Sequence, residues 1–344
     1  MSSTVSDAFS QQPDWLWSLL DLAPELGRSE ALGRAGLSLV DGLIRSDSLR
    51  SAAQEQTEQT FGFKWAKRDT YESEAMRSQM REWLLQKYGS PIELPIWNAA
   101  EPIVLDAGCG AAYSALEFFA PVFDRIRYLG VDISEAVDVA RQRFMDRKLD
   151  RAAFIQADLV NLPVRDESVD IIFSEGVLHH TDSTKGAILA LAKKLKPDGA
   201  FLFYVYRRKG PIREFTDDYI REKLQDMSPQ EAWDAVMPLS QLGQVLGDLN
   251  VEVEVPATID LLEIPAGKIN LQRLFYWHVF KAFYRPEMTM DEMNHLNFDW
   301  YAPKNAHRQS IEEVRAWCVE AELQVLHETV EDAGITIVAK KGPH

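Results

Sequence analysis

The sequence predicts an α/β protein built on a doubly wound, mostly parallel sheet, with an antiparallel C-terminal hairpin, a helical N-terminal extension and a helical insertion after the fifth strand. Three observations lead to this fold class. Short apolar runs alternate with helical segments between residues 103 and 206, which is typical of βαβ units. The alternation stops over residues 207–308. A capped helix and two strands follow; only a turn separates these strands, so we expect them to pair antiparallel.

The core elements follow from local patterns. Runs rich in β-branched and aromatic residues are bounded by turn residues and by amphipathic stretches. Ser134 is a suitable N-cap for a helix that continues to Arg147, and residues 196–199 (Lys-Pro-Asp-Gly) are typical of a turn. Strands are expected at residues 103–106, 128–133, 153–157, 169–174 and 201–206, and helices at 112–123, 134–147 and 184–195.

The regions outside this core are predicted to be mainly helical. Ser310 and Glu313 have capping-box spacing, which predicts a helix to about residue 321. Helical periodicity is expected over residues 1–60, an aromatic segment at 60–65, a helix at 71–88, a loop at 91–102 and closing strands at 323–328 and 335–340. The predicted domains are a helical N-terminal cover (1–100), a doubly wound core (101–206 and 309–344) and a helical lid (207–308).

Composition excludes several classes of protein. The 344-residue chain has 37 basic and 53 acidic residues and a net charge of −16, so broad binding to nucleic acid or to anionic lipid is not expected. A local basic patch remains at residues 206–209 and at Arg213. The two cysteines, Cys109 and Cys318, predict neither a disulfide framework nor a zinc cluster. We expect a cytoplasmic protein, because the apolar run at residues 15–20 is too short for a signal peptide or a membrane span.

The most informative feature is the turn after the first core strand. Gly108 and Gly110 follow that strand, and Asp106 precedes them. Glycines let the backbone approach a ligand closely, and a strand–glycine–helix junction directs backbone N–H groups toward a nucleotide. A dinucleotide fingerprint needs a further small residue where this chain has Tyr113. Asp132 ends the second strand, where a carboxylate can accept both ribose hydroxyls.

Five motifs in order then resemble one family. Residues 105–110 (Leu-Asp-Ala-Gly-Cys-Gly), 130–134 (Gly-Val-Asp-Ile-Ser), 156–159 (Gln-Ala-Asp-Leu), 162–174 and 195–200 are similar to the motifs of class I (seven-β-strand, Rossmann-like) S-adenosylmethionine-dependent methyltransferases of small-molecule type. The resemblance covers residues 100–206 and 310–340. It implies S-adenosylmethionine as cofactor, with Asp132 at the ribose and Asp158 near the adenine amino group. The implied cofactor-binding residues are Lys64, Tyr71, Asp106, Gly108, Cys109, Gly110, Asp132, Ile133, Ala157, Asp158, Leu159 and Glu175.

Candidate catalytic residues lie after the fourth core strand. In an open α/β sheet the ligand lies outside the carboxyl ends of the strands, which is where Glu175, His179 and His180 are expected. A histidine here could deprotonate an acceptor, because its pKa lies near neutral pH. Alternatively, one histidine caps a helix or bonds to the backbone. Methyl transfer from a sulfonium is an in-line displacement, so a general base is not required.

The flanking segments are expected to choose the acceptor. In the insertion, Arg213, Tyr276, His295 and Asp299 are candidate substrate-binding residues, and Arg207 and Arg208 are further candidates for binding an anionic group. His295, Asp299 and His307 could instead ligate a metal, although their spacing matches no standard motif and we predict no metal site. In the N-terminal cover, Lys64 and Tyr71 are expected at the cofactor or the acceptor.

The predicted function is therefore methyl transfer from S-adenosylmethionine to a small polar molecule, with an O-, N- or C-acceptor left open. Two alternatives stay open as well: a non-catalytic scaffold that binds the cofactor, and an enzyme that uses this cofactor or a dinucleotide for a different transfer. The expected partner is a small-molecule acceptor, with neither nucleic acid nor membrane, and a homodimer is possible.

Overall fold

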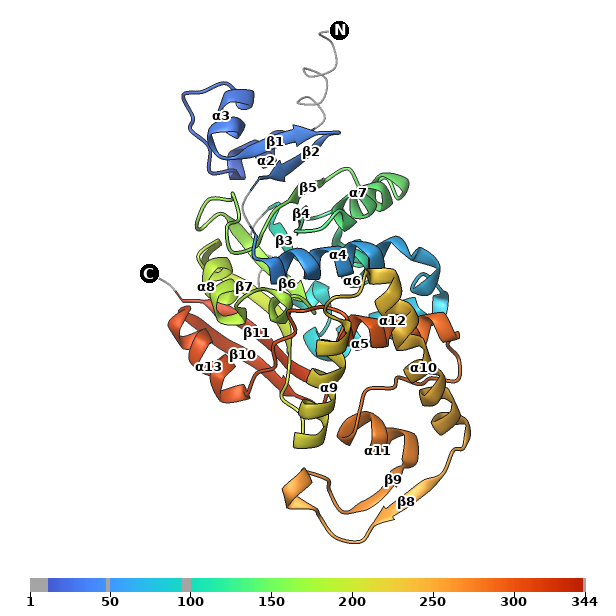
Figure 1. The fold of residues 1–344 in the computed structure, drawn as a ribbon. Helices are drawn as coiled ribbons and strands as arrows, with labels where there is room; N and C mark the ends of the chain where they lie inside the picture. Colours follow the sequence, from blue (N-terminus) through green and yellow to red (C-terminus); the bar gives the residue numbers. More distant parts are fainter. Residues whose placement is uncertain (1–11, 48–49, 95–99, 343–344) are drawn as a thin grey trace.

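A nine-stranded sheet in the order β1-β2-β5-β4-β3-β6-β7-β11-β10 forms the centre of the molecule (Figure 1). The structure is a computed structural model that describes residues 12–47, 50–94 and 100–342. Strands β2 to β7 run parallel, whereas β11 pairs antiparallel with β7 and β10, which confirms the predicted fold class. The core strands are β3 (Ile103–Ala107), β4 (Arg127–Asp132), β5 (Ala152–Gln156), β6 (Val169–Glu175), β7 (Leu195–Tyr206), β10 (Leu323–Val330) and β11 (Gly334–Lys341).

Both faces of this sheet are covered by helices. Side chains alternate between the faces along each strand, so Leu105 belongs to one apolar cluster and its neighbour Val104 to the other. The Leu105 face packs against α8 (Thr184–Ala192) and α13 (Ile311–Glu320), and the Val104 face packs against α5 (Glu74–Tyr88), α6 (Tyr113–Phe118) and α7 (Ala136–Asp146). This two-sided burial explains why the central strands β3, β5 and β6 are mostly apolar.

The N-terminal region contains helices, as predicted, and also a β-hairpin that the prediction did not include. Strands β1 (Leu37–Val40) and β2 (Leu43–Ser46) flank Asp41 and Gly42, which have φ of 49° and 73°. Two consecutive positive φ values are what a two-residue type I′ turn requires. Strand β2 then pairs in parallel with β5 and extends the sheet. Short helices α2 (Asp14–Leu19) and α3 (Arg28–Arg34) precede the hairpin; the predicted structure of residues 1–11 lies outside the described residues.

Helix α4 (Ala52–Ala66) joins two segments that we predicted separately. It includes the end of the region 1–60, for which helical periodicity was expected, and all of the aromatic segment at 60–65. Ser51 caps this helix by accepting a hydrogen bond from the backbone N–H of Gln54 at 3.0 Å. The short helix η1 (Arg68–Thr70) leads to α5, which starts three residues later than predicted, after its N-cap Ser73. Of the predicted loop at residues 91–102, residues 91–93 form the short helix η2 (Pro91–Glu93), and residues 95–99 lie outside the described part of the chain.

Three core boundaries differ from the prediction for local reasons. The first core helix ends at Phe118, and Ala120–Val122 forms a separate 3-10 turn, η3, that contains a proline. The N-cap of α7 is Glu135, one residue later than predicted, although the hydroxyl of Ser134 accepts the backbone N–H of Ala136 at 3.3 Å while it donates to Asp132 at 2.6 Å. Helix α8 ends at Ala192, and the predicted turn at residues 196–199 lies within β7, opposite an irregularity in the register of β6.

The insertion after β7 is mainly helical, as predicted, and it also contains a small hairpin that the prediction did not include. Its helices are α9 (Pro211–Leu224), α10 (Pro229–Asp248), the 3-10 helix η5 (Asp260–Leu262), α11 (Leu271–His278) and α12 (Met290–Tyr301). Strands β8 (Glu252–Val255) and β9 (Gly267–Asn270) pair antiparallel, and Figure 1 shows them with α11 at the end of the insertion far from the N-terminal hairpin. The capping box of Ser310 and Glu313 is confirmed. None of the described helices has the length and apolar character needed to cross a bilayer.

Candidate active site

A cavity of about 510 Å³ follows the carboxyl edge of the sheet. Its floor contains Leu159 after β5, Ile133 after β4, Gly108 after β3, Gly176 after β6 and Lys209 after β7. These strands are consecutive in the sheet, so at roughly 4.8 Å per strand the floor spans about 19 Å. Helices α4 and α5 contribute to one side of the wall, and α11 and α12 to another. The cavity is therefore formed jointly by the core, the N-terminal region and the insertion.

The glycine turn at this floor cannot accept side chains. Gly108 has φ of 84°, and a Cβ there would lie 2.2 Å from Cγ1 of Val177. Gly110 has φ of 50°, and its Cβ would lie 2.6 Å from Nε1 of Trp65, which projects from α4. Between them, Cys109 is buried, and burial raises the pKa of its thiol well above the usual value, so the thiol is not a nucleophile. The two glycines therefore form a close-packed backbone cradle, of which Gly108 lines the cavity.

Asp132 at the end of β4 connects the glycine turn after β3 to the segment after β4 by hydrogen bonds. One carboxylate oxygen accepts the backbone N–H of Gly110 at 2.8 Å, and the other accepts the N–H and hydroxyl of Ser134 at 2.8 and 2.6 Å. Burial raises the pKa of Asp132, and these hydrogen bonds oppose the shift. The side chain lines the cavity beside the glycine turn. A fixed carboxylate and a glycine cradle on adjacent strands fit a ribose-containing cofactor.

The segment after β5 supplies the next part of the floor. Asp158 and Leu159 line the cavity, whereas Ala157 is fully buried behind it. The carboxylate of Asp158 accepts the backbone N–H of Val160 and the side-chain amide of Asn161, both at 3.1 Å. Asp158 therefore stabilises its own turn at the cavity wall, and its predicted contact with adenine stays a prediction.

Asp106 lies beneath the glycine turn and does not line the cavity. Its carboxyl accepts a hydrogen bond from the hydroxyl of Tyr128 on the neighbouring strand β4. Burial raises the pKa of Asp106 to about 7, and the Tyr128 hydrogen bond opposes that shift. The residue thus supports the floor from below, and its predicted contact with the cofactor stays a prediction.

Replacing Asp106 with asparagine is expected to flatten the pH dependence of stability. The folded protein holds a proton on this carboxyl up to about pH 7, whereas an unfolded aspartate loses it near about pH 4. The free energy of unfolding therefore falls as pH rises through this window, by up to about 1.4 kcal/mol per pH unit. Urea unfolding at about pH 5 and about pH 7.5 measures the effect. An equally steep pH dependence in Asp106→Asn would contradict it.

Glu175, a predicted catalytic residue, is already paired. Its carboxylate accepts from Nζ of Lys87 at 2.8 Å and from the hydroxyl of Tyr88, both on α5. The Lys87 ammonium lies 3.3 Å from the ring centre of Trp83 and 3.2 Å from that of Tyr204. Burial lowers the pKa of Lys87 to about 8, and Glu175 opposes the shift. Glu175 lines the cavity, but as one member of a buried ion pair rather than as a free base.

The two predicted histidines lie in the short helix η4 (Leu178–His180) and differ in their surroundings. His179 stacks on Tyr206 with ring centres 3.6 Å apart, and neither ring nitrogen has a hydrogen-bond partner within the described residues. His180 lines the cavity, and its Nδ1 donates to the backbone oxygen of Asn305 at 2.6 Å. Burial lowers the pKa of His180 to about 4 and that of His179 well below its usual value. The backbone bond of His180 matches the alternative interpretation of the sequence.

Helix α12 brings His295 to the cavity in a defined tautomer. The hydroxyl of Thr70 donates its single proton to the backbone oxygen of Lys67 at 2.7 Å and also lies 2.8 Å from Nδ1 of His295. Nδ1 must therefore carry the proton and donate it, which leaves Nε2 as an acceptor. Burial lowers the pKa of His295 well below its usual value, so the ring is neutral at pH 7.

Lys64 and Asp299 join the N-terminal cover to α12. They form an ion pair, and Asp299 also accepts from the hydroxyl of Tyr206 at 3.0 Å. Burial raises the pKa of Asp299, but the charges of Lys64, His180 and Lys281 outweigh it and keep the pKa well below the usual range. Tyr71 also lines the cavity, donates to the backbone oxygen of Trp65 at 2.7 Å, and has a pKa raised by burial to about 12.

These pairings bear on the other predicted roles. Lys64 forms its ion pair with Asp299, so its predicted contact with the cofactor stays a prediction. No group of three or more histidine, cysteine, aspartate or glutamate side chains in the described ranges is arranged to hold a metal ion, and His307 is absent from the cavity lining.

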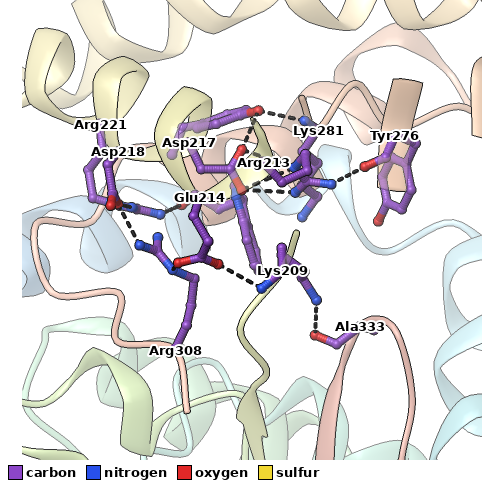
Figure 2. A network of polar contacts seen from close by, with 12 residues as sticks. Lys209, Arg213, Glu214, Asp217, Asp218, Arg221, Tyr276, Lys281, Arg308 and Ala333 are labelled. Carbon is purple, nitrogen blue, oxygen red and sulfur yellow. Dashed lines mark hydrogen bonds and ion pairs between the residues drawn. The ribbon is translucent and has the colours of Figure 1, made fainter. Parts of the chain in front are cut away.

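Among the predicted substrate-binding residues, Arg213 and Tyr276 both line the cavity. Figure 2 shows the hydrogen bond from the Arg213 guanidinium to the Tyr276 backbone. Arg213 is almost fully buried; its guanidinium pairs with Asp217 at 3.0 Å and donates to the backbone oxygen of Tyr276. Arg207 and Arg208 do not line the cavity and instead pair with Asp332 at 3.8 Å and Glu313 at 2.9 Å. Many other lining residues were not predicted from the sequence, among them Trp65, Val177, Arg273, Trp277, Lys281 and Trp300.

Comparison with known proteins identifies the same region. The sequence profile of the family described as "Methyltransferase domain" matches residues 105–203. The uncharacterized methyltransferase YcgJ of Bacillus subtilis is 30% identical over 179 residues, which cover 49% of this chain and 68% of YcgJ. The crystal structure of YcgJ gives a TM-score of 0.42 at 16% identity, covering 78% of this chain and 100% of that chain.

A second relative is the malonyl-[acyl-carrier protein] O-methyltransferase of Priestia megaterium, 26% identical over 188 residues, which cover 54% of this chain and 64% of that protein. The profile match spans the strands that carry Gly108, Asp132, Asp158 and Glu175, which are the strands that form the cavity floor. This chain belongs to the class I, Rossmann-like family of S-adenosylmethionine-dependent methyltransferases.

Proposed function

We propose that this enzyme transfers a methyl group from S-adenosylmethionine to a small polar molecule that binds beneath α11 and α12. The observation that carries the proposal is a continuous cavity that extends from the glycine turn to the insertion. A volume of about 510 Å³ lies in the range of small-molecule sites. We assign residues 1–100 to the cover, 101–206 with 309–344 to cofactor binding, and 207–308 to acceptor selection.

We assign cofactor binding to the part of the cavity floor that follows β3, β4 and β5. Asp132 would accept the ribose hydroxyls, Gly108 would allow close approach of the backbone, and Ile133, Asp158 and Leu159 would enclose the base. The bound cofactor supplies an electrophilic methyl group on a sulfonium. The protein's task is then to align donor and acceptor and to exclude water, which Trp65 and Tyr71 support by closing the N-terminal side of the cavity.

His295 is the residue we assign to the acceptor proton. Its Nε2 is an acceptor because Nδ1 donates to Thr70, and the ring lines the cavity. A base of low pKa suffices when the acceptor proton becomes acidic as the new bond to methyl forms. His180 is the second imidazole at the wall, with Nδ1 fixed by Asn305. Glu175 and His179 are not assigned a proton role, because one is ion-paired and the other lies outside the cavity lining.

Two experiments test this function. Calorimetry with S-adenosylmethionine, S-adenosylhomocysteine and NAD should show saturable binding of the first two alone; binding of NAD alone would overturn the proposal. Release of S-adenosylhomocysteine in the presence of small polar acceptors should then rise above the rate without acceptor. A protein that binds the cofactor but transfers no methyl group to any acceptor of a broad panel would instead be a scaffold.

Once turnover is measured, His295→Gln is expected to lower kcat by about tenfold or more, because a positioned base contributes at least that much. Affinity for S-adenosylhomocysteine should not change, and Gln230→Ala on the exposed face of α10 is a matched surface control. An unchanged kcat at every pH would remove His295 from the proton transfer.

A further inference from the structure

The end of the cavity beside β7 concentrates positive charge in a chain whose net charge is −16. Three cationic groups surround the indole of Trp300: Nζ of Lys281 is 5.0 Å, Nζ of Lys209 5.5 Å and the guanidinium carbon of Arg213 5.6 Å from the ring centre. Figure 2 shows these cations converging from the end of β7, from α9 and from the segment before α12. All three side chains and Trp300 line the cavity.

The neighbouring carboxylates neutralise only part of this charge. Asp217, fully buried, pairs with Arg213 and also accepts from Tyr301 at 3.1 Å. Asp299, a half-buried carboxylate nearby, is the ion-pair partner of Lys64. Glu214 accepts the backbone N–H of Lys209, but its carboxylate is engaged by Arg308 at 2.8 Å.

Two ammonium groups are therefore left without a carboxylate. Nζ of Lys209 donates to the backbone oxygens of Asp332 and Ala333, the latter at 2.8 Å. The side chain of Lys281 makes no hydrogen bond and no ion pair with another residue of the described ranges. Burial lowers the pKa of Lys209 to about 7 and that of Lys281 to about 8, and the charge of Arg213 adds to both shifts. Such groups gain most from an anion placed between them.

The cofactor's ribose is too far away to explain this charge. The ribose carboxylate Asp132 is on β4, and Lys209 follows β7, three strand positions along the sheet. At roughly 4.8 Å per strand this separation is about 14 Å. The basic end therefore belongs to the part of the cavity that we assign to the acceptor.

We propose that the acceptor is a small anion, whose carboxylate or phosphate binds between Lys209 and Lys281, with its apolar part against Trp277 and Trp300. This inference rests on the proposed function, because it names the class of molecule that the same cavity methylates. Trp277 lines the cavity next to Lys209, whose Nζ is 5.8 Å from the Trp277 ring centre. Indole faces beside ammonium groups suit a flat molecule that carries an acidic substituent.

Binding of defined probes to the complex with S-adenosylhomocysteine tests the proposal. Calorimetry at about pH 6.5 should show saturable binding of benzoate or phenyl phosphate, and affinity for neutral benzyl alcohol should be at least about tenfold weaker. Tighter binding of benzoate would indicate a carboxylate site, and tighter binding of phenyl phosphate would indicate a phosphate site. Inorganic phosphate alone tests whether the aromatic ring of the probe is needed for binding. Equal affinity for the neutral probe, or no binding of either anion, would overturn the proposal.

Variants connect this binding to the two lysines. Lys281→Met and Lys209→Met should each weaken the better anionic probe by at least about tenfold, whereas Lys281→Arg should retain most of the affinity. Lys185→Met is the matched control, because it removes an ammonium that pairs with Glu320 at the surface. We expect all four variants to bind S-adenosylhomocysteine as tightly as the parent protein does. If the parent protein itself did not bind S-adenosylhomocysteine, the proposed function would be refuted. If Lys281→Met and Lys209→Met both bound the anionic probe as tightly as the parent protein, only the anionic acceptor would be refuted.

The pH dependence gives a second readout that does not need variants. The anion binds the protonated ammonium groups, so affinity should be highest below about pH 7 and fall as pH rises through about 8, with proton uptake on binding near pH 8. Affinity that rises with pH would overturn the proposal. The charged groups that act on the two lysines in this window are Lys64, Arg207, Arg213, Asp217 and Asp299.

Discussion

Replacing Asp132 with alanine is expected to weaken binding of S-adenosylmethionine by about 100-fold. Two hydrogen bonds from ribose hydroxyls to a carboxylate contribute about 3 kcal/mol together, and each 1.4 kcal/mol is about tenfold in affinity. The carboxylate also holds the backbone N–H of Gly110 and both donors of Ser134, so the variant additionally loosens the glycine turn. Calorimetry with S-adenosylhomocysteine measures the loss without requiring an acceptor.

Asp138→Ala is the matched control for this experiment. Asp138 lies on α7 and pairs with Arg45 at 2.9 Å, and its side chain is 42% exposed. Removing such an exposed pair changes stability by about 1 kcal/mol or less and should leave the cofactor affinity unaltered. If Asp132→Ala also bound the cofactor like the parent protein, the end of β4 would not be the ribose site.

Replacing Lys87 with methionine is expected to lower the free energy of unfolding by about 3 to 5 kcal/mol, which is typical when one partner of a buried ion pair is removed. The side chains of Lys87 and Glu175 are 2% and 4% exposed, so the remaining carboxylate would be buried with only the hydroxyl of Tyr88 as its partner. The rings of Trp83 and Tyr204 also lose the cation between them. Urea unfolding at neutral pH measures the change.

A double variant separates charge from packing. Lys87→Met combined with Glu175→Gln removes both charges and should recover most of the stability, because no buried charge is left unpaired. Lys340→Met is the control, since Lys340 pairs with Asp198 and is 40% exposed, so its loss should cost about 1 kcal/mol or less. A single Lys87 variant as stable as this control would show that the pair contributes little to the fold.

The core of the fold could be predicted from the sequence because its signals are local. Each core strand is a short apolar run that ends in a turn residue, and the capping box at Ser310 is visible within four residues. The N-terminal hairpin also has a local signal, Asp41-Gly42 between apolar residues, but the surrounding helical periodicity obscured it. The hairpin pairs with β5, which lies more than 100 residues further along the chain. No local sequence pattern predicts this pairing.

The site was predictable only in part for the same reason. Gly108, Asp132, Asp158 and Glu175 come from motifs at strand ends, and all four line the cavity. The contacts that orient the site residues come from distant segments. Lys87 on α5 pairs with Glu175, and Thr70 forms a hydrogen bond with His295, which lies 225 positions away in the sequence. Lys281 is a single lysine among aromatic residues, and only the fold reveals that no carboxylate accompanies it.

The parallel pairing of β2 with β5 has a consequence for how the molecule behaves among its own copies. Without the N-terminal hairpin, β5 would be the margin of the sheet, and its backbone would present unpaired N–H and C=O groups between buried apolar side chains such as Phe154 and Ile155. Open margins of this kind template pairing between chains. The hairpin replaces this margin with β1, a strand of four residues whose side chains become progressively more exposed toward Val40. A segment that contributes no residue to the cavity floor thereby protects the protein against intermolecular sheet growth.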